Sequence, residues 1–319
     1  MPSAEEEDQA NRFRTYLNYL LSVSNFIDDV KDDPAKLVKT VIEADGFRNI
    51  QGGRCEDIDK IGLLLRNAWF TEIQMDISGQ YEEFVSYSNH WIPVQLYYTA
   101  YLTLRAYYLS RGQSIPKEHA SNLKAIAQDI NNRPDLFPQP WKAICIGNPD
   151  DSTAEIINLP PDVSIKIISS LSSSSKVQFW DSYGMFLKTT RLRQIETLCT
   201  DWKSRNKKKR INPKEKQRFI TNLVPTTLFH ALYRLRLRSN YADADSFLLA
   251  SQGTSEAIDF HRALQKIGWS TSLILELLIA RYIGKRPFAQ LVDKFRKYDD
   301  KGRSENLVCL RWDALQKLW

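Results

Sequence analysis

The residue types best suited to chemistry lie in the stretch RLRSNYADAD, from Arg236 to Asp245. Two arginines, two aspartates, an asparagine and a tyrosine fall within ten positions there. Guanidinium groups bind phosphate through paired hydrogen bonds, and carboxylates and phenols can move protons. The stretch is therefore a candidate phosphate-binding site, with Arg236 and Arg238 as the candidate phosphate contacts. The competing interpretation is structural, with Arg234 or Arg238 paired with Asp245 inside a helical bundle.

A second candidate is the basic segment from Phe186 to Arg218. It contains twelve Lys or Arg residues and three Asp or Glu, a net charge of +9 against +6 for the whole chain. Local positive charge is what a polyanion site requires. The nucleic-acid-binding residues that we expect are in or beside the run KSRNKKKR: Lys203, Arg205, Lys207, Lys208, Lys209 and Arg210. A solvated helix followed by a basic loop is the alternative.

Signatures of the common enzyme classes are missing. The sequence has no GxxxxGK[ST], GxGxxG, HExxH or GxSxG motif, and its four histidines are far apart. None of its four cysteines belongs to a CxxC pair or lies beside a histidine. We therefore expect no metal site and no cofactor, and the cysteine pattern favours a reducing cytoplasm over a disulfide-rich exterior.

The composition is that of a soluble and mainly helical protein. Of 319 residues, 43% are hydrophobic and 26% are charged, with 12 Gly and 13 Pro. No apolar run approaches the ~18 residues of a membrane span, and the N-terminus is acidic and lacks the apolar core of a secretory signal. We expect a cytoplasmic protein that makes no contact with a membrane.

Apolar residues at helical spacing indicate which elements position the candidate residues. Leu228, Leu232 and Leu235 mark the buried side of a helix predicted from Pro225 to Ala250, so the polar residues above would flank an apolar row. The segments AEIINLP and VSIKIISSL alternate like strands and predict a small hairpin. The other predicted helices cover Glu5–Phe26, Pro34–Val41, Glu56–Gln74, Pro93–Arg111, His119–Ile130, Lys176–Lys203 and Ser255–Ile283.

The order of these features resembles the HEPN superfamily (higher eukaryotes and prokaryotes nucleotide-binding). The stretch YYTAYLTLRAYYLSRGQSIPKEHASNL, from Tyr97 to Leu123, is similar to that family's aromatic first helix, which ends in Gly and is soon followed by a His, here His119. Arg236, Asn240 and Tyr241 fall on the Arg-x-x-Ala-Asp-Tyr motif of one branch, with Asn in place of Asp and Ser239 in place of Ala. The resemblance covers about residues 85–284.

The resemblance implies an all-α fold built around an up-and-down helical bundle. The expected organisation is an N-terminal helical region at 1–83, the bundle at 84–284 and a C-terminal helical extension at 285–319. A Pro- and Ser-rich insertion at 133–220, containing the predicted hairpin, would interrupt the bundle.

The resemblance also implies a ligand and a set of candidate residues. HEPN proteins bind nucleic acid or nucleotide, commonly form homodimers, and include bacterial toxins and defence effectors that cleave RNA without a metal. RNA or a nucleotide is therefore the expected partner, and a homodimer the expected assembly. The candidate catalytic residues are Arg236, Arg238, Asn240, Tyr241, Asp245 and His119.

One departure from the family pattern leaves the function open. Family nucleases carry an Arg, then four to six residues, then a His, and no Arg in this chain precedes a His at that spacing. The first interpretation is a metal-independent RNA endonuclease with a degenerate motif. The second is a catalytically silent interaction or scaffold subunit of a defence or toxin–antitoxin complex, whose partner protein carries the chemistry. The third is a purely structural helical protein.

Overall fold

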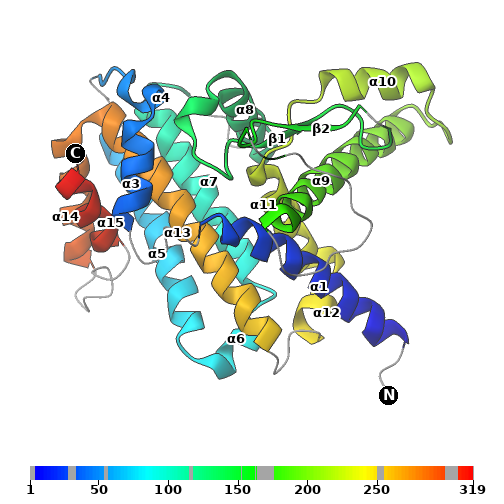
Figure 1. Ribbon diagram of the computed structural model, residues 1–319, viewed down its shortest axis with the longest axis horizontal. Helices are drawn as coiled ribbons and strands as arrows, with labels where there is room; N and C mark the ends of the chain where they lie inside the picture. The colour runs from blue at the N-terminus through cyan, green and yellow to red at the C-terminus, as the bar shows by residue number, and fades with distance from the viewer. Residues whose placement is uncertain are drawn as a thin grey trace.

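The computed structural model describes residues 4–27, 34–53, 57–114, 118–151, 153–161, 163, 176–249, 255–298 and 308–318. The fold is all-α, as the composition predicts (Figure 1). Its elements are α1 (Ala4–Asn25), α3 (Pro34–Glu43), α4 (Asp45–Arg48), α5 (Ile58–Gly79), α6 (Glu82–Ser88), α7 (Ile92–Ser110), α8 (His119–Asn132), the 3-10 turn η1 (Pro134–Leu136), β1 (Ile144–Ile146), β2 (Glu155–Ile157), α9 (Lys176–Arg205), α10 (Pro213–Asn222), α11 (Leu228–Leu237), the π-helical turn η2 (Arg238–Ala242), α12 (Ala244–Leu249), α13 (Ser255–Ile283), α14 (Lys285–Tyr298) and α15 (Val308–Leu318).

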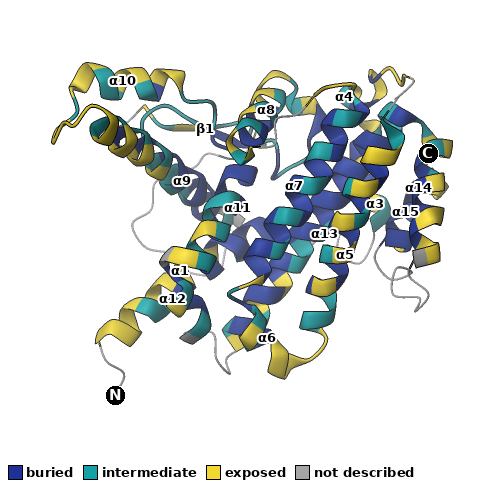
Figure 2. Cartoon of the chain, turned by 180° about the vertical axis from the view of Figure 1, so that it is seen from behind, coloured by how far each residue is buried: buried dark blue, intermediate teal, exposed yellow. Residues whose placement is uncertain are grey.

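Helices α7 and α13 form the centre of the molecule. They pack against each other, and α7 also contacts α5 and α11. Figure 2 shows both central helices largely buried. The sequence predicts α7 from Pro93 in its first turn and from Gly112 just past its end, and Gly112 does adopt the left-handed conformation, with φ of 69°. Helix α13 is long and apolar enough to cross a membrane, but 83% of its most apolar window is buried inside the fold.

The N-terminal helices pack directly on this centre. Helix α1 lies against α13, α9 and α12, and its Phe13 and Leu20 are fully enclosed. Helix α5 has the most extensive contact with α7. Residues from the N-terminal region, from the predicted bundle and from the C-terminal helices α14 and α15 belong to one hydrophobic core.

The predicted insertion contains the small sheet. Strand β2 lies inside the segment AEIINLP, as expected, but its partner is β1 from upstream, with Ile144 opposite Ile157. Cys145 also forms a bridge with Thr226, just before α11. The second segment of the predicted hairpin, VSIKIISSL, falls almost entirely outside the described residues.

Helices α9 and α10 extend together from one end of the molecule, opposite α14 and α15 (Figure 1). The periodicity of the sequence does not predict α10, which has a single buried residue, Ile220, and hence almost no apolar stripe. Its start is nevertheless encoded locally. The Asn212 side chain accepts a hydrogen bond from the Lys214 N–H at 2.9 Å, and Pro213 follows as the first helical residue.

Candidate functional site

Helix α11 and the turn η2 that follows it carry most of the candidate residues, and a local signal starts α11. Thr227 is the N-cap, and its N–H donates to His230 Nδ1 at 3.3 Å. Burial, with a smaller contribution from Arg191, lowers the pKa of His230 to about 3, so its ring is neutral and serves as a cap. Leu228, Leu232 and Leu235 are buried. The predicted apolar side of this helix is confirmed.

The predicted continuous helix from Pro225 to Ala250 is wrong beyond Leu237. The backbone N–H of Asp243 bonds to the carbonyl of Arg238 at 2.8 Å, a step of five residues, which closes the π-helical turn η2. Helix α12 then begins at Ala244. The extra residue in the turn rotates all following side chains around the helix axis. The positions of the polar residues after Leu237 therefore cannot be inferred from the spacing of a regular α-helix.

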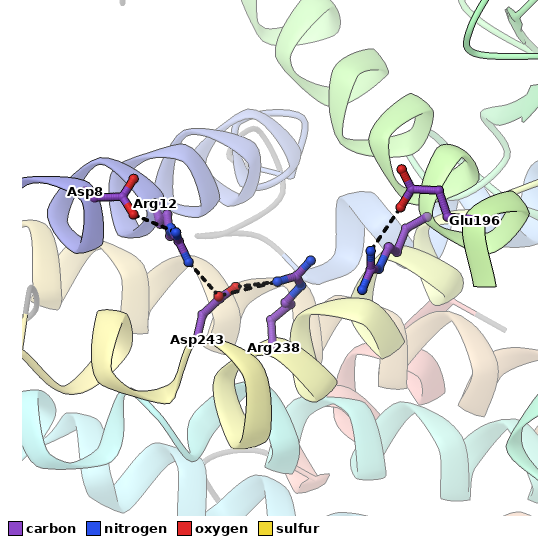
Figure 3. Close-up of polar contacts among 6 residues, drawn as sticks. Asp8, Arg12, Glu196, Arg238 and Asp243 are labelled. Carbon is purple, nitrogen blue, oxygen red and sulfur yellow. Dashed lines mark hydrogen bonds and ion pairs between the residues drawn. The ribbon is translucent and has the colours of Figure 1, made fainter. Parts of the chain in front are cut away.

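The ion pair near this turn differs from the one expected (Figure 3). Arg238 Nη1 lies 3.1 Å from Asp243 Oδ2, and Arg12 Nη1 of α1 lies 3.2 Å from Asp243 Oδ1. The Asp243 side chain is 5% exposed. Asp245, which the structural interpretation paired with Arg234 or Arg238, is exposed. Arg238 is therefore partly neutralised by a buried carboxylate, shared with Arg12.

Arg236 has a different environment from Arg238. Its guanidinium carbon lies 5.5 Å, 5.0 Å and 5.7 Å from the ring centroids of Tyr97, Tyr98 and Tyr233. Its Nη2 donates to the Tyr98 hydroxyl at 3.1 Å. Within the described part of the chain, no carboxylate forms an ion pair with this half-buried cation. Tyrosine faces stabilise it without removing its positive charge.

His119 joins the same cluster from the first residue of α8. Its Nδ1 is hydrogen-bonded to the Tyr97 hydroxyl at 3.0 Å, and its ring centroid lies 5.8 Å from that of Tyr233. Burial, then the charges of Arg236 and Arg105, lower the pKa of His119, so the imidazole is neutral at pH 7. We name the group of Tyr97, Tyr98, His119, Tyr233 and Arg236 the Arg236–His119 site.

The other predicted site residues lie outside this cluster. Tyr241 is 69% exposed and Asn240 is half-buried, both in the turn η2. Of the six basic residues predicted to bind nucleic acid, two lie in the last turn of α9 and four in the loop that follows. Lys203 is half-buried and the other five are exposed. Since α9 rises 1.5 Å per residue, this basic loop is roughly 20 Å along the helix from Thr190, which contacts α11.

A cavity beside α11 is not predicted by any sequence pattern. It has a volume of about 760 Å³ and is lined by residues of α8, α9, α10 and α11 and of the segments that follow α10 and α11. Arg234 and Arg238 line it together with Lys124 and Arg193. Its walls come from distant parts of the chain, so no local pattern marks it. The one available signal is the few apolar residues of α9 and α10 that the main core does not use, such as Leu198 and Phe219.

Comparison with known proteins identifies no relative. No family model, no curated protein and no solved structure matches this chain. Among the described residues, no group of three or more His, Cys, Asp or Glu is placed to hold a metal ion. The function must therefore be inferred from the geometry of the sites described above.

Proposed function

We propose that this protein is a HEPN-like protein that binds RNA or a nucleotide through phosphate contacts at the Arg236–His119 site. The observation that carries the proposal is Arg236, a half-buried guanidinium that has tyrosine rings around it and no carboxylate partner in the described part of the chain. A buried charge without a counter-ion is costly, and an anionic ligand supplies the missing charge. Phosphate suits this role because its oxygens match the planar fork of guanidinium donors.

The neighbours of Arg236 suit a nucleotide better than a bare anion. Tyrosine rings stack on bases of any identity, and such stacking contributes about 1 to 3 kcal/mol per base. The exposed Tyr241 adds a second aromatic surface on the adjoining turn. The basic loop at Lys207–Arg210 supplies charge for a longer strand. RNA would then contact the Arg236–His119 site with a phosphate and its bases, and the loop with more of its backbone.

The same residues would allow metal-independent cleavage of RNA. Neutral His119, with its Nδ1–H donated to the Tyr97 oxygen, would take the proton of a 2′-hydroxyl at Nε2. The 2′-oxygen would then attack the phosphorus, and Arg236 would stabilise the negative charge of the phosphorane. The P–O bond to the 5′-oxygen breaks, and that oxygen takes a proton from water. The products are a 2′,3′-cyclic phosphate and a 5′-hydroxyl.

Removing the Arg236 charge tests the binding proposal. In Arg236→Ala we expect the Kd for a labelled single-stranded RNA to rise about 10- to 100-fold, because one hydrogen-bonded charge contact contributes roughly 1.5 to 3 kcal/mol. Fluorescence anisotropy at fixed salt measures the change. The matched control is Arg286→Ala, an exposed arginine on α14 at the other end of the molecule, which should leave the Kd unchanged. Equal affinity of the two variants contradicts the proposal.

A second candidate function is the scaffold subunit, and one surface favours it. Tyr81, Phe84, Tyr87 and Trp91 are 57%, 57%, 70% and 45% exposed along α6 and its flanks. Clustered exposed aromatic residues mark contacts with other proteins. Incubating the purified protein with labelled RNA in EDTA separates the two functions. Cleavage that disappears in both Arg236→Ala and His119→Asn supports the nuclease, whereas RNA that is bound and stays intact supports the scaffold.

The basic loop has its own expected signature. Replacing Lys207, Lys208, Lys209 and Arg210 with glutamine should reduce the slope of log Kobs against log salt by about 0.7 for each phosphate that these residues bind on a single strand. Anisotropy titrations measure that slope between about 50 and about 200 mM salt. Phosphate contacts are strongly screened over this range. An unchanged slope would mean that the loop is a solvated surface, as the alternative interpretation holds.

A further inference from the structure

The cavity beside α11 combines apolar walls with cations. Leu123 of α8, Leu198 of α9 and Leu223 after α10 contribute aliphatic side chains, and Leu237 closes the α11 side. Its volume of about 760 Å³ falls in the range of sites that enclose a whole small molecule. Leu198 and Leu237 retain exposed surface although they face this space. Apolar surface left open in this way indicates a ligand with an apolar body.

The charged residues of the lining are all basic. Lys124, Arg193, Arg234 and Arg238 line the cavity, and none of its lining residues is an aspartate or glutamate. Arg193 pairs with Glu196 at 3.0 Å and Arg238 with Asp243 at 3.1 Å (Figure 3). These two cations are therefore partly neutralised.

Arg234 differs from both. Its Nη1 donates to the hydroxyl oxygens of Thr189 and Thr190 at 2.7 Å and 3.3 Å, and its Nε is buried without a hydrogen-bond partner. The described part of the chain gives it no carboxylate. Threonine hydroxyls fix the position of the guanidinium but do not balance its charge. An uncompensated cation in an apolar cavity favours an anionic group on the ligand.

We propose that this cavity binds a fatty-acid anion, with the carboxylate at Arg234 and the alkyl chain between the leucines of α8, α9 and α11. Such binding goes beyond the nucleotide binding assigned to the Arg236–His119 site. Residues 234 and 236 are about 200° apart around the helix. Arg234 contacts α9, whereas Arg236 contacts Tyr98 of α7. The two arginines thus lie on opposite sides of α11, and Tyr233, which contacts Arg236, also lines the cavity.

The aliphatic walls favour an alkyl chain over a nucleobase. The surface that the lining exposes to the cavity is mostly hydrocarbon, which suits an alkyl chain better than the polar edge of a base. Each methylene that leaves water on binding should increase affinity roughly fourfold. A series of fatty acids from octanoate to dodecanoate should therefore bind with steadily rising affinity, until the chain fills the cavity.

The proposal is tested on the full chain by displacement of the fluorescent probe 1-anilinonaphthalene-8-sulfonate. Its fluorescence is measured at fatty-acid concentrations below micelle formation. We expect dodecanoate to displace the probe about tenfold more tightly than the uncharged dodecanol, as one charge-assisted contact allows. Equal displacement by both, or displacement by adenosine monophosphate in preference to dodecanoate, would overturn the assignment. So would the absence of any chain-length dependence.

Two variants locate the ligand. Arg234→Met should weaken dodecanoate binding about tenfold and leave dodecanol binding unchanged, while Leu198→Trp should place a bulky ring in the path of the alkyl chain and weaken both. Leu198 is half-buried, so this variant tests the site even if Arg234→Met fails to fold. Arg286→Ala is the control that should bind both ligands normally. RNA affinity should survive Leu198→Trp, so failure of the fatty-acid proposal is distinguishable from failure of the proposed function.

Discussion

Replacing Arg311 with methionine is expected to lower the free energy of unfolding by about 3 to 5 kcal/mol. Arg311 of α15 is 1% exposed and donates to two buried carboxylates, Glu72 of α5 and Glu276 of α13. Four hydrogen bonds of 2.7 to 3.0 Å connect the guanidinium to them. Without the arginine, two carboxylates would face each other in the core with no cation.

Chemical unfolding in urea, followed by circular dichroism, measures this destabilisation. Arg296→Met is the matched control, because Arg296 of α14 is 42% exposed, its ion pairs are 3.7 and 3.8 Å long, and its Nε donates only to the weak acceptor Cys309 Sγ, so its removal should change stability by less than about 1 kcal/mol. A compensated variant with Arg311→Met, Glu72→Met and Glu276→Gln should recover most of the stability. The glutamine keeps an acceptor for Trp69 Nε1, which donates to Glu276 at 2.7 Å. Similar unfolding of the two single variants would disprove the role of Arg311.

This ion-pair network also shows what the sequence could not predict. The periodicity of apolar residues predicts most of the long helices, because a buried stripe is encoded within each helix. Arg311 is 35 and 239 residues from its two partners, and no local pattern indicates that they meet. The sequence accordingly predicts a C-terminal helical extension but not its attachment to α5 and α13.

The candidate site likewise contains features that the sequence predicts and features that it does not. Arg236 and His119 are both predicted from sequence as site residues, and the structure brings them into one cluster through Tyr97. The role of Arg238 depends on η2, since that turn places Asp243 beside it instead of Asp245. A single inserted residue in a helical ladder leaves no periodic signal. The cavity at Arg234 escapes prediction because its walls are assembled from separate elements.

Acidification from pH 7 to pH 5 is expected to destabilise the fold by about 4 kcal/mol through two buried histidines. Burial lowers the pKa of His230 to about 3 and that of His261 to about 4, from an ordinary value of 6.5. His261 is 1% exposed and lies between the Met75 carbonyl and the Asn89 side chain. Each ring is therefore neutral in the folded protein at pH 5, while the unfolded chain takes up a proton at each.

The sign follows from these depressed pKa values. The stability that the neutral rings contribute is fully present above pH 6.5 and is lost as the pH falls to about 4 for His261 and about 3 for His230, with a limiting slope of about 1.4 kcal/mol per pH unit for each histidine. Glu72 acts in the opposite direction, because burial raises its pKa and its protonation favours the folded state as the pH falls. Urea unfolding at intervals between pH 7 and pH 5 measures the net slope. His261→Gln should remove about half of the histidine contribution, since glutamine does not titrate, and a slope unchanged by that substitution would show that His261 is not the group responsible.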